Sequence, residues 1–428
     1  VLDRFAAESV HFTQAVANYP VCSPTRAMLM SGQYPVRNRV VNNCTSKTAE
    51  FQCELQETTR CWSDVLKEQG YSLGYIGKWH LDSPYEPFIP TSNNQGEVKW
   101  NEWCPPGRRH GFDYWHAYGT YDYHLRPMYW DTEAPRDSFK YYDEWGPEHE
   151  ANRAIDYIRN KNGKFRKEGQ PFALVVSMNP PHTAYHLVPE KYKKLYENIP
   201  VESLVSKPNV PEAGTRWGDH YRKNIKNYYA CISGVDEQFG RILQALKEQG
   251  LDENTIVVFT SDHGDCIGTH EEETKNNPYE ESMRVPLLIR YPGKLKPQHN
   301  DVLLSTPDIY PTLLGLMGFE NLIPKEVDGQ NFAGYLRTGK GKTPESQWYM
   351  RVENGKTEYG TRGVRTLRYT YVINQNASGR KVMLFDRQTD PYQLDNLAGK
   401  KPKQEKKLSR EMESWLRKSN DPWLKHIQ

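Results

Sequence analysis

The sequence predicts an α/β protein, because helix-like and strand-like segments alternate along most of the chain. Residues 229–249 place apolar side chains at helical spacing, which predicts an amphipathic helix that ends near Gly250. The apolar run at 255–260 follows and predicts a strand. An earlier pair has the same order, with a helix at 62–70 and a strand at 72–76. Two helix-to-strand units predict parallel pairing in a central sheet.

Two further apolar runs predict buried strands of the same sheet. They span residues 172–178 and 285–290, and each lies next to a polar cluster. Because ligands bind outside the carboxyl ends of the strands in open α/β sheets, the polar residues that follow these strands are candidates for chemistry.

The chain is predicted to divide into a large domain and a smaller C-terminal one, since 428 residues are many for one compact core. Residues 1–345 form the predicted catalytic α/β domain. Within it, residues 82–149 are rich in Trp, Tyr, Pro and Gly and form a structured insertion in the substrate wall. Residues 346–428 contain short alternating segments that predict a small antiparallel sheet, followed by a charged helix at 406–418.

Composition argues against two classes of partner. A formal net charge of +2 provides no global field for nucleic acid. No run approaches the roughly 20 apolar residues of a membrane-spanning helix, so no membrane span is expected. The 28 Tyr and 11 Trp suit stacking on sugar rings, and equally any large interface. Six cysteines besides Cys22 could form disulfides in an exported protein, and most are expected to be structural.

The strongest functional signal is the run from Val21 to Arg26, which contains Cys-x-Pro-x-Arg. This run resembles the activation signature of the formylglycine-dependent sulfatases. Residues 27–35 look like the helix and turn that follow the family's nucleophile, and residues 2–12 resemble the helix that precedes it. This resemblance implies that a maturation enzyme oxidises Cys22 to formylglycine and that Arg26 orients the modified residue. It also implies an alkaline phosphatase-like fold with a large, mostly parallel central sheet between helices.

Four more residues lie in segments that resemble other motifs of that family. Lys78 and His80 follow a predicted strand, His182 stands in Asn-Pro-Pro-His after another, and Lys275 precedes Tyr-Glu-Glu-Ser-x-Arg-Val-Pro. The resemblance implies that the lysines bind sulfuryl oxygens and that the histidines move protons. It implies attack of the modified residue on sulfur, protonation of the leaving sugar oxygen by His182 or Lys275, and sulfate release assisted by His80.

The run Ser-Asp-His-Gly at 261–264 resembles the metal-binding turn of the family. The resemblance implies that Asp262, His263 and the modified Cys22 hold one calcium ion, a cation that prefers oxygen ligands. Similar sulfatases begin with a strand that ends in paired aspartates, and no such pair precedes Leu2 here. We therefore expect an incomplete chain that lacks two metal carboxylates, binds metal weakly and turns over slowly.

The predicted function is hydrolysis of sulfate esters in a sulfated carbohydrate, such as ulvan or a glycosaminoglycan. The candidates for sugar recognition are Tyr121, His124 and Arg126 in the insertion, and Arg362 and Arg365 near the C-terminus. A polymeric substrate implies a periplasmic or secreted protein. Two alternatives stay open: a phosphodiesterase or phosphonate monoester hydrolase of the same superfamily, and a non-catalytic, glycan-binding pseudosulfatase.

Overall fold

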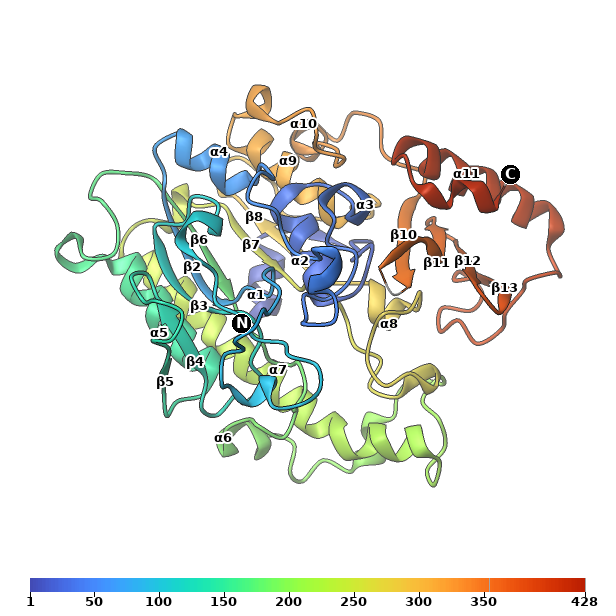
Figure 1. Cartoon of the computed structure of the whole chain (residues 1–428), viewed down its shortest axis with the longest axis horizontal. Helices are drawn as coiled ribbons and strands as arrows, with labels where there is room; N and C mark the ends of the chain where they lie inside the picture. Colours follow the sequence, from blue (N-terminus) through green and yellow to red (C-terminus); the bar gives the residue numbers. More distant parts are fainter. Residues whose placement is uncertain (354, 428) are drawn as a thin grey trace.

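The computed structural model describes residues 1–353 and 355–427, and they form an α/β protein as predicted. Figure 1 shows the C-terminal sheet and α11 at one end of the molecule, and β3, β4 and β5 at the other. The helices are α1 (Leu2–Ala7), α2 (Cys22–Ser31), α3 (Pro35–Asn38), α4 (Trp62–Glu68), α5 (Gly146–Arg159), α6 (Glu190–Lys193), α7 (Arg216–Glu248), α8 (Glu280–Met283), α9 (Thr306–Leu316), α10 (Ala333–Thr338) and α11 (Pro402–Lys418). The strands are β1 (Val10–Phe12), β2 (Ser72–Lys78), β3 (Tyr114–Tyr118), β4 (Met128–Asp131), β5 (Lys140–Tyr141), β6 (Phe172–Ser177), β7 (Val257–Thr260), β8 (Leu287–Arg290), β9 (Gln298–Asn300), β10 (Gln347–Glu353), β11 (Lys356–Arg365), β12 (Tyr369–Asn376) and β13 (Gly379–Asp386).

The first sheet has the strand order β5-β4-β3-β2-β6. Its central strand, β2, is fully buried and runs parallel to both β3 and β6, as predicted for this part of the chain. The strands β4 and β5 extend the edge with antiparallel pairing. Because β3, β4 and β5 all lie within 82–149, the region predicted to be an insertion also supplies strands to the sheet.

The second sheet has the order β7-β8-β1-β9 and mixed strand directions. β7 pairs antiparallel with β8, so the parallel pairing predicted for the second helix-to-strand unit is wrong. The helix predicted over 2–12 is also too long. It ends at Ala7, and Val10 and Phe12 instead form a strand between β8 and β9, where their side chains are buried.

A cavity of 1890 Å³ lies along β6 and β7, between the two sheets. In the part of the chain that the structure describes, β6 pairs only with β2 and β7 only with β8. The side chains of β6 and β7 are only partly buried, although both runs are apolar and the run that contains β6 was predicted to be buried. The central sheet is thus in two pieces here. The strand with paired aspartates that the family resemblance implies stays a prediction.

Helix α7 is longer than the sequence pattern predicts, because it begins at Arg216. The hydroxyl of Thr215 caps it by accepting a hydrogen bond from the amide of Gly218 at 3.1 Å. The polar first turns of the helix conceal its period, yet Tyr221 and Ile225 are buried there. α7 packs on α5, which in turn contacts β2 and β6. None of the described helices combines the length and the apolar composition that crossing a bilayer requires.

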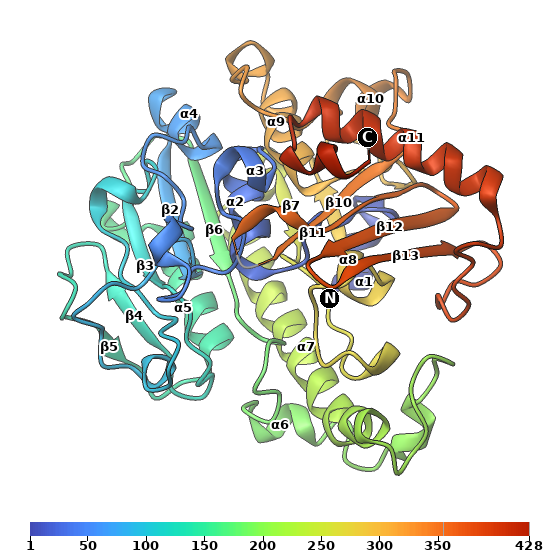
Figure 2. The same cartoon turned by 45° about the vertical axis from the view of Figure 1, so that its right-hand side comes forward.

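The C-terminal region forms the predicted antiparallel sheet, with β10 to β13 in sequence order and α11 packed against it (Figure 2). α11 buries Leu408, Met412 and Leu416, which recur every four residues on one helix face. Trp348 of β10 belongs to the same apolar cluster as Met28 of α2. The C-terminal sheet therefore shares its core with the larger part, and the domain boundary at 345 stays a prediction.

The two C-terminal arginines that were predicted to bind sugar lie inside the protein, so that prediction is wrong. Arg362 is fully buried and its guanidinium pairs with Asp421 at 2.6 Å. Arg365 is equally buried, pairs with Glu280 at 2.7 Å and donates to the side-chain oxygen of Gln347. Buried guanidinium groups need such partners, because an unpaired charge in the interior is costly. Both arginines tie the C-terminal sheet to its neighbours.

Replacing Arg362 with alanine is expected to lower the free energy of unfolding by about 3 to 5 kcal/mol, because Asp421 would be left as an unpaired buried charge. Urea denaturation measures this change. Arg417→Ala is the matched control, since Arg417 pairs with Glu413 on α11 and both side chains are exposed to solvent, so its loss should have a much smaller effect. Equal losses in the two variants would contradict the structural role of Arg362.

All seven cysteines are buried, and none forms a disulfide within the described residues. The disulfides considered for an exported protein are therefore not present. Cys44, Cys53, Cys61 and Cys104 lie in the large apolar cluster that surrounds α2 and β2. They pack there as small apolar side chains.

Candidate active site

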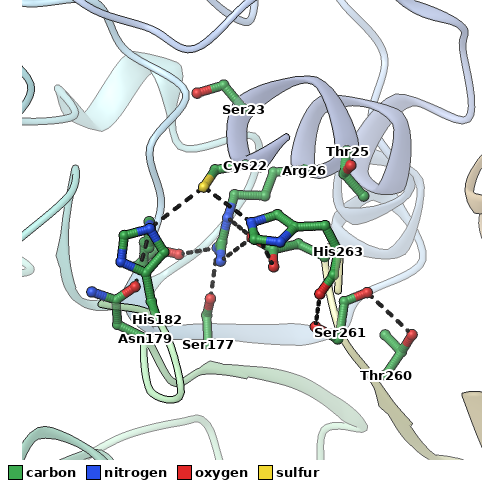
Figure 3. Close-up of polar contacts among 12 residues, drawn as sticks. Cys22, Ser23, Thr25, Arg26, Ser177, Asn179, His182, Thr260, Ser261 and His263 are labelled. Carbon is green, nitrogen blue, oxygen red and sulfur yellow. Dashed lines mark hydrogen bonds and ion pairs between the residues drawn. The ribbon is translucent and has the colours of Figure 1, made fainter. Parts of the chain in front are cut away.

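The residues predicted to carry the chemistry converge at the carboxyl ends of β2, β6 and β7. Lys78 is the last residue of β2, His182 lies in the loop after β6, and Asp262 follows β7. Cys22 is the first residue of α2, and Figure 3 shows its side chain between His182 and His263. Strands and a helix that are far apart in sequence thus meet at one point, as expected for an open α/β sheet.

The thiol of Cys22 is held among cationic and imidazole groups. Its sulfur lies 3.5 Å from Nζ of Lys275, 3.7 Å from Nζ of Lys78 and 3.4 Å from Nε2 of His263. Burial raises the pKa of this thiol, but Lys275, Lys78 and His263 lower it more, so the net pKa lies well below the usual range. The position at the N-terminus of a ten-residue helix also favours negative charge. Residue 22 is therefore placed to stabilise an anion.

Arg26 lies one turn after Cys22 and connects α2 to the ends of the strands. Its Nε donates to Oδ2 of Asp262 at 3.0 Å, and its Nη1 donates to the carbonyl oxygen of Lys78 and to Oγ of Ser177, both at 2.7 Å. Burial raises the pKa of Asp262, but His263 and Arg26 lower it more and keep the carboxylate ionised. This network fixes the first turn of α2 against β2, β6 and β7.

Lys78 enters the site because β2 approaches β6 closely at Gly77. Gly77 has φ of +99°, and a Cβ atom there would lie 2.2 Å from the carbonyl oxygen of Ser177. Only glycine permits this contact. The buried Nζ of Lys78 then donates to Oδ1 of Asn179 at 3.1 Å, while burial lowers the pKa of the lysine. Asn179 was given no role from the sequence, although it stands in the motif that contains His182.

His80 is buried beside Cys22 in a strained backbone conformation. Its φ is +52°, which is uncommon for a residue with a side chain. Its Nε2 lies 3.1 Å from the carbonyl oxygen of Cys44, while its Nδ1 is buried without a hydrogen-bond partner among the described residues. Burial lowers the pKa of this imidazole, so it is neutral and able to accept a proton.

His182 is oriented by a carboxylate that the sequence reasoning missed. Nδ1 of His182 lies 3.2 Å from Oδ1 of Asp122, and the side-chain amide of Asn179 donates to the same oxygen at 3.1 Å. Burial and the two lysines lower the pKa of His182, but the bonds with Asp122 and Cys22 raise it more, and the net pKa lies above its usual value. Asp122 belongs to the run Tyr121–His124 that was singled out for sugar binding, but only the fold brings it to His182.

Replacing Asp122 with asparagine is expected to lower the pKa of His182, because the anion that stabilises the imidazolium is lost. If His182 acts as an acid, activity falls as the pH rises through its pKa. The alkaline fall of kcat/KM should therefore move to lower pH in the variant. Asp122→Glu, which keeps the charge, should restore most of the profile.

Asp143→Asn is the control for this experiment, since Asp143 is an exposed carboxylate that pairs with Arg126 in the same region. It should leave the profile in place. A uniform loss of rate in Asp122→Asn, with the alkaline fall at its original pH, would contradict the positioning role.

The three residues of the insertion that were predicted to bind sugar have different surroundings. Tyr121 is buried in an apolar cluster with Tyr129 and Trp130. His124 is also buried, and its Nε2 lies within 3.1 Å of the carbonyl oxygens of His182 and Thr183. The His124 side chain thus supports the loop that holds His182, and for both residues direct sugar contact stays a prediction. Arg126 is exposed, and for it the prediction stands untested.

The predicted metal ligands lie together, but they do not form a calcium site by themselves. One ligand atom each from Cys22, Asp262 and His263 lies within 4.8 Å of the others. Calcium takes about six to eight oxygen ligands, whereas this set offers one carboxylate, one imidazole and one sulfur. Oδ2 of Asp262 is also already bound by Arg26. The described residues alone therefore do not fit the predicted ion.

Known proteins with similar sequences point to one family. Residues 1–319 match the sulfatase family, and residues 268–421 match the C-terminal region of N-sulphoglucosamine sulphohydrolase. An endo-4-O-sulfatase of Bacteroides thetaiotaomicron is 39% identical, over 99% of this chain and 85% of that protein. An ulvan-active sulfatase of Formosa agariphila is 34% identical, over 93% of this chain and 72% of that protein.

Solved structures of similar proteins point to the same family. The structure of yidJ from Bacteroides fragilis, a protein assigned to the sulfatases, superposes with a TM-score of 0.96 at 52% identity and covers 100% of this chain and 92% of that one. A protein of the glycosaminoglycan locus of Bacteroides thetaiotaomicron superposes with a TM-score of 0.91 at 37% identity, over 99% of this chain and 90% of that one. The chain therefore belongs to the sulfatase family, and it is a sulfuric ester hydrolase.

Proposed function

We propose that this sulfatase hydrolyses sulfate esters of a sulfated carbohydrate, and that it does so after conversion of Cys22 to formylglycine. The observation that carries the proposal is the setting of Cys22, a buried side chain at a helix N-terminus with the ammonium groups of Lys275 and Lys78 at 3.5 and 3.7 Å. Such a site stabilises a sulfuryl group, because negative charge develops on several of its oxygens in the transition state. The sulfur of the thiol marks the place of the hydroxyl oxygens that the converted residue would carry.

The surroundings of Cys22 fit the converted residue. His80 has a buried Nδ1 without a partner among the described residues, and it faces Cys22 closely enough for a hydrogen bond between the two side chains to affect its pKa. A second hydroxyl on residue 22 would satisfy this nitrogen. The formylglycine hydrate would supply two hydroxyl groups, one as the nucleophile toward sulfur and one from which the sulfate could later be expelled.

The residues of the chain then have separate roles in the reaction. Lys78 and Lys275 stabilise the negative charge on the nonbridging oxygens of the sulfuryl group. When the bond between sulfur and the sugar oxygen breaks, the sugar oxygen takes a proton from His182 or Lys275. His80, neutral because of burial, accepts the hydroxyl proton when sulfate leaves residue 22.

Two relatives support a carbohydrate substrate, because one is named for endo-4-O-sulfatase activity and the other for activity on ulvan. A glycosaminoglycan or an ulvan-like polysaccharide is accordingly the proposed substrate class. Sulfatases generally use formylglycine and a divalent metal, so a maturation enzyme is a proposed partner and a divalent metal ion a proposed cofactor. Calcium, the predicted ion, would need oxygen ligands beyond the carboxylate of Asp262. For a polymeric substrate we also propose a periplasmic or secreted location.

Release of free sulfate from a panel of sulfated glycans tests the proposal. The full gene product, with any residues that precede Val1, is co-expressed with a formylglycine-generating enzyme, and conversion of Cys22 is checked by peptide mass. Sulfate released from at least one glycan, and not by Cys22→Ala, supports the proposal.

The same assay separates the alternatives. Phosphate release from diesters or phosphonates that exceeds sulfate release would favour the phosphodiesterase or phosphonate hydrolase. Binding of a glycan without any release, by protein with confirmed formylglycine, would favour the pseudosulfatase.

A further inference from the structure

A second, smaller pocket adjoins the catalytic residues and has no role in the reaction described above. It is a shallow, open hollow of 420 Å³ at the surface. Its lining consists of Ser92, Asn93, Gly96, Val98, Trp100, Asp122 and Tyr123. All of these residues lie in the region 82–149, which the sequence analysis assigned to the substrate wall.

Two residues of the pocket lining also contact residues of the active site around Cys22. Asp122, on one side, is the carboxylate that holds Nδ1 of His182 at 3.2 Å. Trp100, on the other, has its ring centre 6.3 Å from that of His80, the histidine beside Cys22. A group in this pocket would therefore lie directly next to a sulfuryl group held at residue 22.

The pocket is rigid. The side-chain amide of Asn93 donates to Oδ2 of Asp122 at 2.9 Å, and the backbone amide of Asp122 donates to Oδ1 of Asn93 at 3.2 Å. The buried side chain of Asn94 accepts from the backbone amides of Trp100 and Asn101 at 2.7 and 2.8 Å. These bonds hold Trp100 in place before any ligand binds, so little ordering entropy is lost on binding.

The chemistry of the lining suits a sugar ring. Tyr123 is 48% exposed and, with Trp100, offers an aromatic surface against which the C–H groups of a pyranose can pack. Ser92 and Asn93 offer groups that can bond to hydroxyls. No lysine or arginine lines the pocket, and its one charged group is the carboxylate of Asp122. Because His182 pairs with that carboxylate, the lining offers aromatic and polar contacts rather than a free charge.

We propose that this pocket, between Trp100 and Tyr123, binds the sugar ring that carries the sulfate ester to be cleaved. This inference rests on the proposed function, since it assigns the sugar to the same catalytic site.

The test compares Tyr123→Ala and Trp100→Ala with Tyr85→Ala in the converted protein. Tyr85 is a matched control, because it is 47% exposed in the same region but does not line the pocket. The substrate probe is a chondroitin 4-sulfate tetrasaccharide or, if the panel selects another glycan, the tetrasaccharide of that glycan. The inhibition constant of inorganic sulfate reports only on the anion-binding site around residue 22.

Each pocket variant is expected to lower kcat/KM for the tetrasaccharide about tenfold, the loss that removal of one well-packed aromatic contact causes. Inhibition by inorganic sulfate should stay unchanged, and Trp100→Phe, which keeps an aromatic face, should retain most of the activity.

Equal kinetics of the Tyr123 and Tyr85 variants would overturn the assignment of the pocket while leaving the sulfatase function intact. Absence of sulfate release from every glycan by the unchanged protein would instead overturn the proposed function, and this inference with it.

Discussion

Replacing Cys22 with alanine is expected to lower the rate of sulfate release by a factor on the order of 10⁶, the loss seen when a catalytic nucleophile is removed. The other residues of the site should remain in place, because Arg26, and not Cys22, holds α2 to the ends of the strands. Thermal unfolding of the variant should therefore match that of the unchanged protein. Residual sulfate release at more than a few per cent of the original rate would contradict the role of Cys22.

Serine at position 22 distinguishes the attack on sulfur from the later expulsion of sulfate. A serine hydroxyl can attack the sulfuryl group and release the sugar, but it has no second hydroxyl to help expel the sulfate. Cys22→Ser is therefore expected to release at most one equivalent of sugar and to retain a sulfate ester. Mass spectrometry of the peptide that contains residue 22 would detect the added sulfuryl group, and repeated turnover by this variant would contradict the need for two hydroxyls.

Replacing His182 with asparagine is expected to lower kcat for sugar sulfates by about 10² to 10⁴, the usual contribution of a general acid. His182 is protonated below its raised pKa, so the activity of the unchanged protein should fall as pH rises through that value. The variant should lose this alkaline fall. Measurement of kcat/KM across pH for both proteins provides the comparison.

The same profile decides between the two candidate acids. If Lys275 donates the proton, the alkaline fall should survive in His182→Asn and disappear in Lys275→Gln. An activated aryl sulfate, whose leaving oxygen needs little protonation, is the control substrate, and with it the loss in the variant of the acid should be much smaller.

Several elements could be predicted from the sequence because local signals agreed with the fold. α2 begins at Cys22 and ends at a glycine in the left-handed conformation, within the segment predicted to be helix and turn. Lys78, His182 and Asp262 lie at or just beyond strand ends, where polar residues after apolar runs indicated them. The positions of these residues after predicted strands were sufficient to place them in one site, because the carboxyl ends of neighbouring strands meet at one edge of a sheet.

The errors have tertiary causes. Arg362 and Arg365 look like surface residues in an alternating strand, and only the positions of Asp421 and Glu280 show why they can be buried. Val10 and Phe12 continue an apolar pattern typical of a helix, yet β8 and β9 offer them pairing. Asp122 carries no signal of its own, because its role depends on the approach of His182 from the loop after β6.

The most direct test of the account is to measure the rate of sulfate release against the fraction of Cys22 converted to formylglycine, in samples expressed with increasing amounts of maturation enzyme. Peptide mass gives the fraction, and ion chromatography gives the sulfate. The account predicts a rate proportional to that fraction, with no release from unconverted protein. Equal rates in converted and unconverted samples would contradict the central role assigned to residue 22.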